Sequence, residues 1–177
     1  MLSPKNQTVI LKRVDEELSR IGESRSLIIC GGSALIVMGI IDRQTRDVDV
    51  LEPEIDSLLS DIAVRIGKEF GLSDKWLNNG PESLRRDLKP GWRTRTASIF
   101  KGKALEMRSL GREDLLATKL YAFCDREDDL EDVLKLKPTR TELANIFHWV
   151  LKRDASPKWP KRVRDCFSRL REKLKYE

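Results

Sequence analysis

Apolar and polar positions alternate along the chain in two different rhythms, one helical and one typical of strands. Apolar side chains recur every three or four residues in the helical segments, whereas short continuous apolar runs bounded by polar turns indicate strands. In the first half of the chain, the predicted helices cover residues 5–21, 32–38 and 55–70, and the predicted strands cover residues 26–30 and 47–51.

The second half of the chain is predicted to hold a loop, a β-hairpin and then helices alone. Residues 71–92 are rich in Asn, Gly, Pro and charge, and predict a long loop. The hairpin is placed at residues 93–100 and 104–109, and the later helices at 112–124, 127–136, 139–152 and 157–174. We therefore predict an α/β (α+β) fold with a small mixed sheet backed by helices. Residues 1–137 form its core, and residues 138–177 form a helical extension packed on that core.

Composition narrows the class of protein. The chain has 177 residues, of which 40% are hydrophobic, and this is enough for a real core. It contains neither an apolar run of bilayer length nor a signal-peptide pattern at its start, so we expect a cytoplasmic protein without a membrane partner. The three cysteines lack metal-ligand spacing, which predicts buried, reduced thiols.

The strongest candidate chemistry lies near residues 31–49. An apolar run stops at Gly31-Gly32-Ser33, which indicates a strand, a tight turn and a helix start with Ser33 near the cap. Backbone N–H groups at such a turn favour an anion. Asp47 and Asp49 are two residues apart, so on a strand both carboxylates project from one face. Such a pair can share a hard divalent cation with phosphate oxygens, which predicts chemistry on a nucleotide.

A second block of residues follows, and the two blocks together carry a family resemblance. Lys119 lies in an apolar helical segment, followed by Arg126 and then by Asp129 and Asp132. The glycine turn, the Asp-x-Asp pair and this block, in that order, resemble the DNA polymerase beta-like nucleotidyltransferase superfamily, in particular its branch of bacterial abortive-infection toxins. The resemblance covers roughly residues 25–135.

This resemblance carries expectations about activity and partners. It implies the minimal nucleotidyltransferase fold. It also implies Mg²⁺-dependent transfer of a nucleoside monophosphate from a nucleoside triphosphate (NTP) to a hydroxyl of RNA or protein. It also implies a place in a bacterial toxin–antitoxin or phage-defence pair, with an antitoxin as the partner protein.

The remaining site residues leave alternatives open. A third carboxylate often completes such a site, and the sequence offers Glu106 on a hairpin strand as a metal ligand or Asp129 as a base. Lys119 lies on an apolar helix, where an ammonium needs an anion; the triphosphate is one partner, and snorkelling to the helix edge is the alternative. Arg46 and Arg43 precede the carboxylates, and one of them is expected to contact phosphate.

Two basic segments suggest an RNA or tRNA acceptor. Residues 152–175 carry ten basic and three acidic side chains, and a second basic cluster surrounds Trp92. A solvated helix face explains the first segment equally well. Two classes of function therefore remain: an enzyme, favoured by Asp47 and Asp49, or a catalytically silent protein that keeps the fold to bind a nucleotide, RNA or a partner protein.

Overall fold

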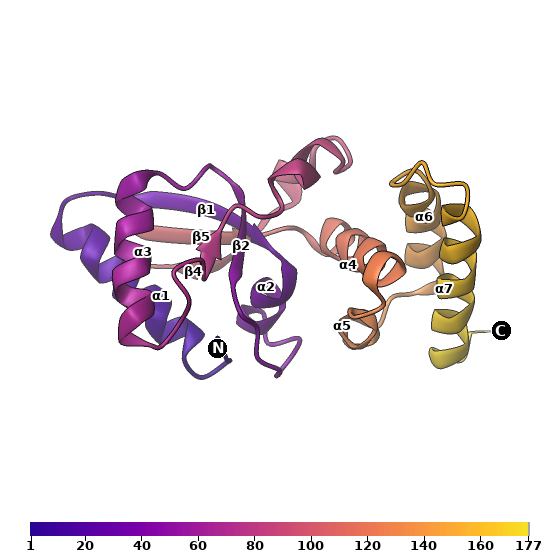
Figure 1. Ribbon diagram of the computed structural model, residues 1–177, viewed down its shortest axis with the longest axis horizontal. Coiled ribbons are helices and arrows are strands. Elements are labelled where there is room, and N and C mark those ends of the chain that lie inside the picture. The colour runs from indigo at the N-terminus through magenta and orange to yellow at the C-terminus, as the bar shows by residue number, and fades with distance from the viewer. Residues whose placement is uncertain (177) are drawn as a thin grey trace. The chain divides into compact units, whose positions relative to one another are not determined.

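The computed structural model describes residues 1–176, except for the side chain of Glu82, and it divides into two compact units. The first unit runs from Met1 to Gly111 and the second begins at Arg112 (Figure 1). The first unit contains α1 (Gln7–Arg20), β1 (Arg25–Cys30), α2 (Gly31–Val37), β2 (Val48–Glu52), α3 (Ser57–Glu69), β3 (Leu77–Asn78), the 3-10 helices η1 (Glu82–Arg86) and η2 (Trp92–Arg95), β4 (Ala97–Lys101) and β5 (Leu105–Ser109). The second contains α4 (Arg112–Arg126), α5 (Leu130–Leu136), α6 (Arg140–Leu151) and α7 (Trp159–Lys173).

The sheet of the first unit has five strands in the order β3-β2-β1-β5-β4. β1 pairs antiparallel with β2 and parallel with β5, and the register sets Cys30 opposite Asp49. β4 and β5 form the antiparallel hairpin that the sequence predicts. This mixed sheet confirms the predicted α/β fold. The register also places the end of β1, where the glycine turn begins, directly beside the start of β2.

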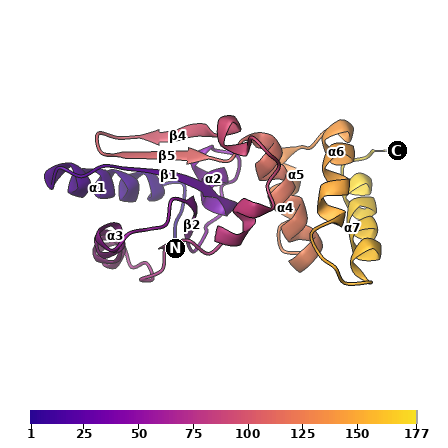
Figure 2. The same cartoon turned by 90° about the horizontal axis from the view of Figure 1, so that it is seen from above.

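Helices α1 and α3 lie side by side in the first unit (Figures 1 and 2). The apolar stripe of α1 is buried at Ile10, Val14 and Leu18, as its helical spacing requires. Burial alternates along β5, with Leu105 and Met107 buried and Glu106 between them half-buried, so one face of this strand packs against the core. The sheet is therefore supported from one side while its polar positions stay accessible.

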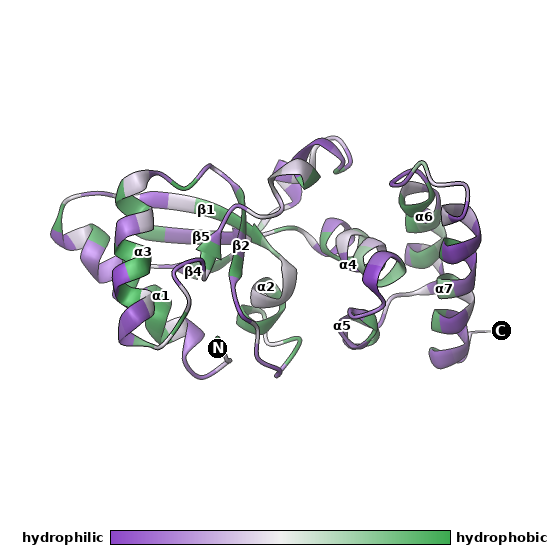
Figure 3. Cartoon of the chain, in the orientation of Figure 1, coloured by the Kyte–Doolittle hydropathy of each residue, from purple (hydrophilic) through white to green (hydrophobic). Residues whose placement is uncertain are grey.

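Four helices make up the second unit, where α4 packs against α5, α6 and α7. Its core is apolar and includes Leu116, Phe123 and Phe167, whose side chains are fully buried. Figure 3 shows hydrophilic colouring along much of α7, the helix that carries the basic segment. A capping box formed by Thr139 and Glu142 begins α6, immediately after Pro138, the first residue of the predicted helical extension.

Two features differ from the sequence-based picture. The predicted loop 71–92 contains the short strand β3, which pairs parallel with β2. The compact units divide at Gly111, before the predicted boundary at residue 137, because α4 packs with the helices that follow it. Glu177, the last residue of the predicted extension, lies outside the described residues. None of the helices within residues 1–176 is both long enough and apolar enough to span a bilayer.

Candidate functional site

The glycine turn lies where β1 ends and α2 begins, and its geometry depends on Gly31. Gly31 has a φ of +74°, a left-handed conformation that other residues rarely adopt. A Cβ atom at this position would lie 2.5 Å from Oδ2 of Asp49, closer than real Cβ atoms approach an oxygen. The absence of a side chain at residue 31 thus makes the room that the Asp49 carboxylate occupies.

The two predicted acidic residues lie at the start of β2. Asp47, just before β2, and Asp49 are half-buried while Val48 and Val50 are fully buried, and this alternation supports the prediction that both carboxylates project from one face. A Cβ on Gly80 would lie 3.8 Å from Oδ1 of Asp49. The Asp49 carboxylate therefore has a glycine near each of its oxygens.

The short strand β3, which the sequence did not predict, lies beside Asp49. In β3, Asn78 pairs in register with Asp49, and its Oδ1 accepts a 2.6 Å hydrogen bond from the backbone N–H of Gly80. Asn79 ties this turn to β2 by donating to the carbonyl oxygen of Val50 at 3.1 Å. The signal was the Asn-Asn-Gly sequence at residues 78–80, which is typical of a tight turn.

Ser33 does not present its hydroxyl at the surface. The residue is 1% exposed, and its Oγ has no hydrogen-bond partner among the described residues. The side chain of Gln7 in α1 donates a 3.3 Å hydrogen bond to the carbonyl oxygen of Ser33. In this conformation any contribution of Ser33 to phosphate binding would come from its backbone, and its role stays a prediction.

A hollow of about 270 Å³ lies at the segment that precedes β2, and two side chains of this segment lie near Gly32. A Cβ on Gly32 would lie 3.4 Å from Oγ1 of Thr45 and 3.5 Å from Nη2 of Arg43, so both side chains reach across this glycine. The backbone of Thr45 pairs with Leu2, which holds the segment in place. The hollow is lined by Met1, Arg43, Gln44, Thr45, Arg46 and Asp47.

Glu106 is not brought to the two aspartates. It is in register with Ser26 of β1, whereas Asp49 is in register with Cys30, four residues further along that strand. At about 3.3 Å per residue, this separates the two positions by roughly 13 Å along the strand direction alone. Glu106 instead pairs with Arg108 at 3.3 Å. Among the described side chains, which do not include Glu82, no group of three acidic, Cys or His side chains could hold a metal ion.

Lys119 in the second unit has acidic partners from its own chain. Its Nζ lies 2.6 Å from Oδ1 of Asp129 and 2.7 Å from Oδ2 of Asp132, and all three side chains are at least nine-tenths buried. Arg126 donates to the other oxygen of Asp129 at 3.1 Å. The expectation that Lys119 needs an anion is therefore met by carboxylates. Phosphate binding by Lys119 and base chemistry by Asp129 stay predictions.

The ring of Trp92, at the centre of the predicted basic cluster, is buried and is not available for stacking on a base. Trp92 is 4% exposed, so its ring cannot stack on a nucleobase. Arg93 lies over this ring at 4.4 Å and pairs with Glu52 at 2.6 Å. The aromatic contribution to polynucleotide binding expected at Trp92 is therefore wrong, because the ring fills the core.

Basic side chains of α7 are accessible, although some are paired. Arg169 forms an ion pair with Glu127 at 3.0 Å, and Arg162 donates to the backbone carbonyl of Asp125. The Glu127 carboxylate has a lowered pKa because Arg169 hydrogen-bonds to it. The α7 surface keeps its positive charge, but these contacts also give two of its arginines structural roles.

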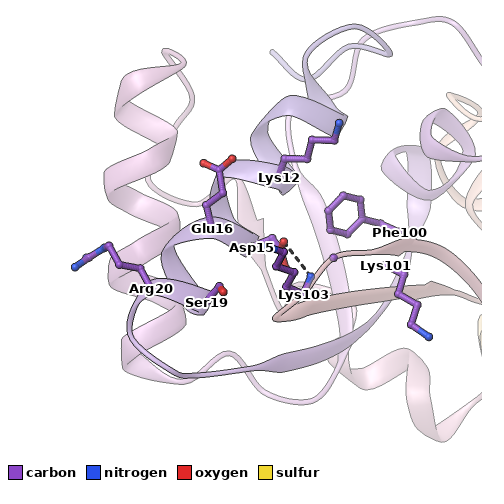
Figure 4. A pocket seen from close by; sticks show the side chains of 9 residues that line it. Lys12, Asp15, Glu16, Ser19, Arg20, Phe100, Lys101 and Lys103 are labelled. Atoms are coloured by element: carbon purple, nitrogen blue, oxygen red, sulfur yellow. Dashed lines mark hydrogen bonds between the residues drawn. The ribbon is translucent and has the colours of Figure 1, made fainter.

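A larger hollow of about 700 Å³ lies between α1 and the β4–β5 hairpin. Figure 4 shows the cationic ends of Lys12, Arg20 and Lys101 pointing away from one another, so they do not converge on a single anion. Asp15 instead joins α1 to the hairpin turn, since its carboxylate accepts backbone hydrogen bonds from Lys103, Ala104 and Leu105 at 2.7–3.1 Å. Burial raises the pKa of Asp15, but these donors outweigh it and the pKa is lowered overall.

Comparison with protein families adds independent evidence. A family model described as "Nucleotidyltransferase of unknown function (DUF6036)" matches residues 10–141. The chain belongs to this family. The matched region contains the glycine turn, both aspartates and the Lys119 cluster, so family membership confirms the nucleotidyltransferase superfamily predicted from the two blocks. No curated protein and no solved structure matches the chain. The narrower abortive-infection branch stays a prediction.

Proposed function

We propose that this protein is a Mg²⁺-dependent nucleotidyltransferase that transfers a nucleoside monophosphate from an NTP to a hydroxyl of RNA or protein. The observation that carries the proposal is the fit between Gly31 and Asp49. The Asp49 carboxylate occupies the space that a Cβ at residue 31 would fill, so the glycine turn and Asp49 lie side by side. Family membership independently supports nucleotidyl transfer at the level of the superfamily.

The residues at this turn fit a magnesium ion. Asp47 and Asp49 supply hard carboxylate oxygens on one side of β2, and Mg²⁺ in phosphate-transferring sites is commonly held by one or two carboxylates together with substrate phosphates. A third protein carboxylate is therefore unnecessary for binding. When bound, the metal would neutralise charge on the triphosphate during transfer.

The reaction requires positioning more than covalent chemistry by the protein. The acceptor hydroxyl oxygen forms a bond to the α-phosphorus, and the bond from that phosphorus to the oxygen that bridges to the β-phosphate breaks. Pyrophosphate leaves with the bonding electrons, and the hydroxyl proton passes to solvent. Asp47 and Asp49 would hold the metal ion that binds the charged end of the NTP, and the absence of a side chain at Gly31 leaves the room that the Asp49 carboxylate occupies. Such pre-organised electrostatics supply most of the rate in reactions of this kind.

The acceptor and the biological setting are parts of the same proposal. The accessible basic residues of α7 favour an RNA acceptor, because phosphate backbones bind to positive surfaces. The resemblance of the two sequence blocks to abortive-infection toxins supports a role in a toxin–antitoxin or phage-defence pair with an antitoxin partner.

A second candidate is a catalytically silent nucleotide-binding protein. It is favoured because, among the described side chains, no third acidic residue is grouped with Asp47 and Asp49. The two candidates are separated by incubating the protein with each NTP, labelled at the α-phosphate, Mg²⁺ and total tRNA. The enzyme leaves label on RNA or protein, whereas the silent protein binds the NTP and leaves none.

Variants make this experiment specific to the proposed site. Asp49→Asn should abolish transfer, whereas Asp61→Asn, at an exposed acid on α3, should leave it unchanged. Transfer that persists in Asp49→Asn would refute the assignment of the site.

A further inference from the structure

The hollow of about 700 Å³ between α1 and the β4–β5 hairpin has a cationic rim. Its basic lining residues are Lys12, Arg20, Lys101 and Lys103, and its acidic ones are Asp15 and Glu16. The Asp15 carboxylate already accepts three backbone hydrogen bonds from the hairpin turn. The rim therefore attracts a partner that carries negative charge.

Two of the lysines are available to such a partner. The side chains of Lys12 and Lys101 are exposed, and neither pairs with a carboxylate among the described side chains. Figure 4 shows their ammonium groups pointing away from each other. A compact anion therefore reaches one ammonium at a time, whereas a chain that carries several spaced carboxylates reaches both.

Phe100 adds an apolar surface to this charged hollow. Its ring is half-buried and lines the hollow, and it belongs to the same strand as Lys101. Figure 4 shows the ring on the side of the hollow where Lys12 and Lys101 lie. An apolar side chain that packs on the ring leaves water, which favours binding. The hollow thus suits a partner with both acidic and apolar side chains.

The other polar groups of the hollow favour a peptide over a nucleic acid. The carboxylate of Glu16 and the hydroxyl of Ser19 line the hollow and are exposed. A carboxylate accepts hydrogen bonds, and a peptide backbone supplies an N–H donor at nearly every residue. An RNA backbone instead brings phosphates, which the carboxylates of Asp15 and Glu16 repel.

From these observations we propose that the hollow is a docking site for an acidic, extended segment of a partner protein. An apolar side chain of the segment packs on Phe100, and carboxylates on either side of it pair with Lys12 and Lys101. Lys101 is in register with Glu106, which lies roughly 13 Å from Asp49 along the strand direction. The docking site is thus separate from the proposed metal site, and the inference does not rest on the proposed function.

The probe is a fluorescein-labelled peptide, Glu-Thr-Glu-Thr-Leu-Thr-Glu-Thr-Glu, whose acidic and apolar side chains share one face of an extended chain. Fluorescence anisotropy measures its binding to the full-length protein. Lys12→Glu and Lys101→Glu should each weaken binding by about threefold to tenfold, because the new carboxylate repels the peptide where the lysine attracted it. Lys68→Glu, the same reversal at an exposed position of α3, is the matched control and should bind like the wild type.

The apolar contact is tested on the wild-type protein alone, so it does not depend on how any variant folds. A peptide with Ser in place of Leu should bind about tenfold more weakly, since it brings no apolar group to Phe100. Circular dichroism checks that each lysine variant is folded.

Four results would overturn the proposal. The wild type fails to bind the Leu peptide, either lysine reversal binds it as Lys68→Glu does, or the Ser peptide binds as tightly as the Leu peptide. The fourth is displacement of the labelled peptide by oligouridylate at a concentration equal to or lower than that of unlabelled peptide, which would identify the hollow as an RNA site.

Discussion

Replacing Gly31 by alanine tests whether the close contact with Asp49 matters for chemistry. Two effects of this change can be separated by a matched control, because Gly22 has nearly the same backbone conformation. The φ values are +74° at Gly31 and +75° at Gly22, but a Cβ on Gly22 would have no neighbour within 4 Å. Gly22→Ala therefore introduces the backbone strain alone, whereas Gly31→Ala adds the collision with the carboxylate.

The strain has the same size in both variants. A non-glycine residue in the left-handed region costs about 1–2 kcal/mol. The reduced freedom of the unfolded chain offsets about 0.4–1 kcal/mol of this, which leaves a net loss near 1 kcal/mol. For a chain of this length, such a loss lowers the Tm by about 2–4 °C. Thermal denaturation followed by circular dichroism should show a decrease of this size for Gly22→Ala and at least as large a decrease for Gly31→Ala.

The effect on transfer should differ between the two variants. In Gly31→Ala the carboxylate must retreat about 1 Å, from the 2.5 Å contact to an ordinary separation near 3.5 Å. A displacement of 1 Å in a catalytic group lowers rates by about 10²-fold. We expect about this loss in NTP-dependent labelling for Gly31→Ala and less than about twofold for Gly22→Ala. Wild-type labelling by Gly31→Ala, or an equal loss in both variants, would refute the reasoning.

Three further outcomes are expected elsewhere in the molecule. The pKa of Asp15 is lowered on folding. The ionised carboxylate therefore stabilises the folded protein above its unfolded pKa of about 3.9, and this stabilisation is lost as the pH falls through the lowered folded pKa. In Asp15→Asn, the free energy of unfolding measured with urea should decline less steeply below about pH 4. Lys119→Met removes the cation that the buried Asp129 and Asp132 carboxylates share, and should destabilise the protein by about 3–5 kcal/mol in the same assay. An unchanged unfolding midpoint would contradict the buried pairing. Replacement of Arg162, Arg164 and Arg169 by Glu should weaken RNA binding without changing NTP affinity. The RNA-binding constant of the wild type should fall with salt concentration, with a log-log slope near −0.7 per phosphate contact. RNA binding that does not depend on salt would argue for a protein acceptor.

Local sequence signals were sufficient for much of the fold. The helical spacing of Ile10, Val14 and Leu18 predicted α1, and the apolar run before Gly31 predicted β1. These elements follow from periodicity that neighbouring residues carry themselves. Strand β3 was missed because two residues carry no periodicity, and Leu77 and Asn78 become a strand only by pairing with β2.

The candidate site was less predictable, because its details depend on contacts between distant residues. Sequence placed Lys119 on an apolar helix but could not identify its partners, which lie ten and thirteen residues further along the chain. It could not show that the Ser33 hydroxyl is buried, since that depends on packing around α2. An aromatic ring among arginines favoured nucleic acid, yet Trp92 is taken up by the core. Residue identities therefore indicated the class of chemistry, and tertiary contacts determined which side chains are available for it.

Nucleotidyl transfer itself is tested most directly by the position of the label in the NTP. Parallel incubations with Mg²⁺ and tRNA should use the same NTP labelled either at the α-phosphate or at the γ-phosphate. The account predicts acceptor labelled only from the α-position, released pyrophosphate carrying the γ-label, and neither product with Asp49→Asn. Acceptor labelled from the γ-position would identify a phosphoryl transfer and contradict the account, as would α-labelling that survives in Asp49→Asn.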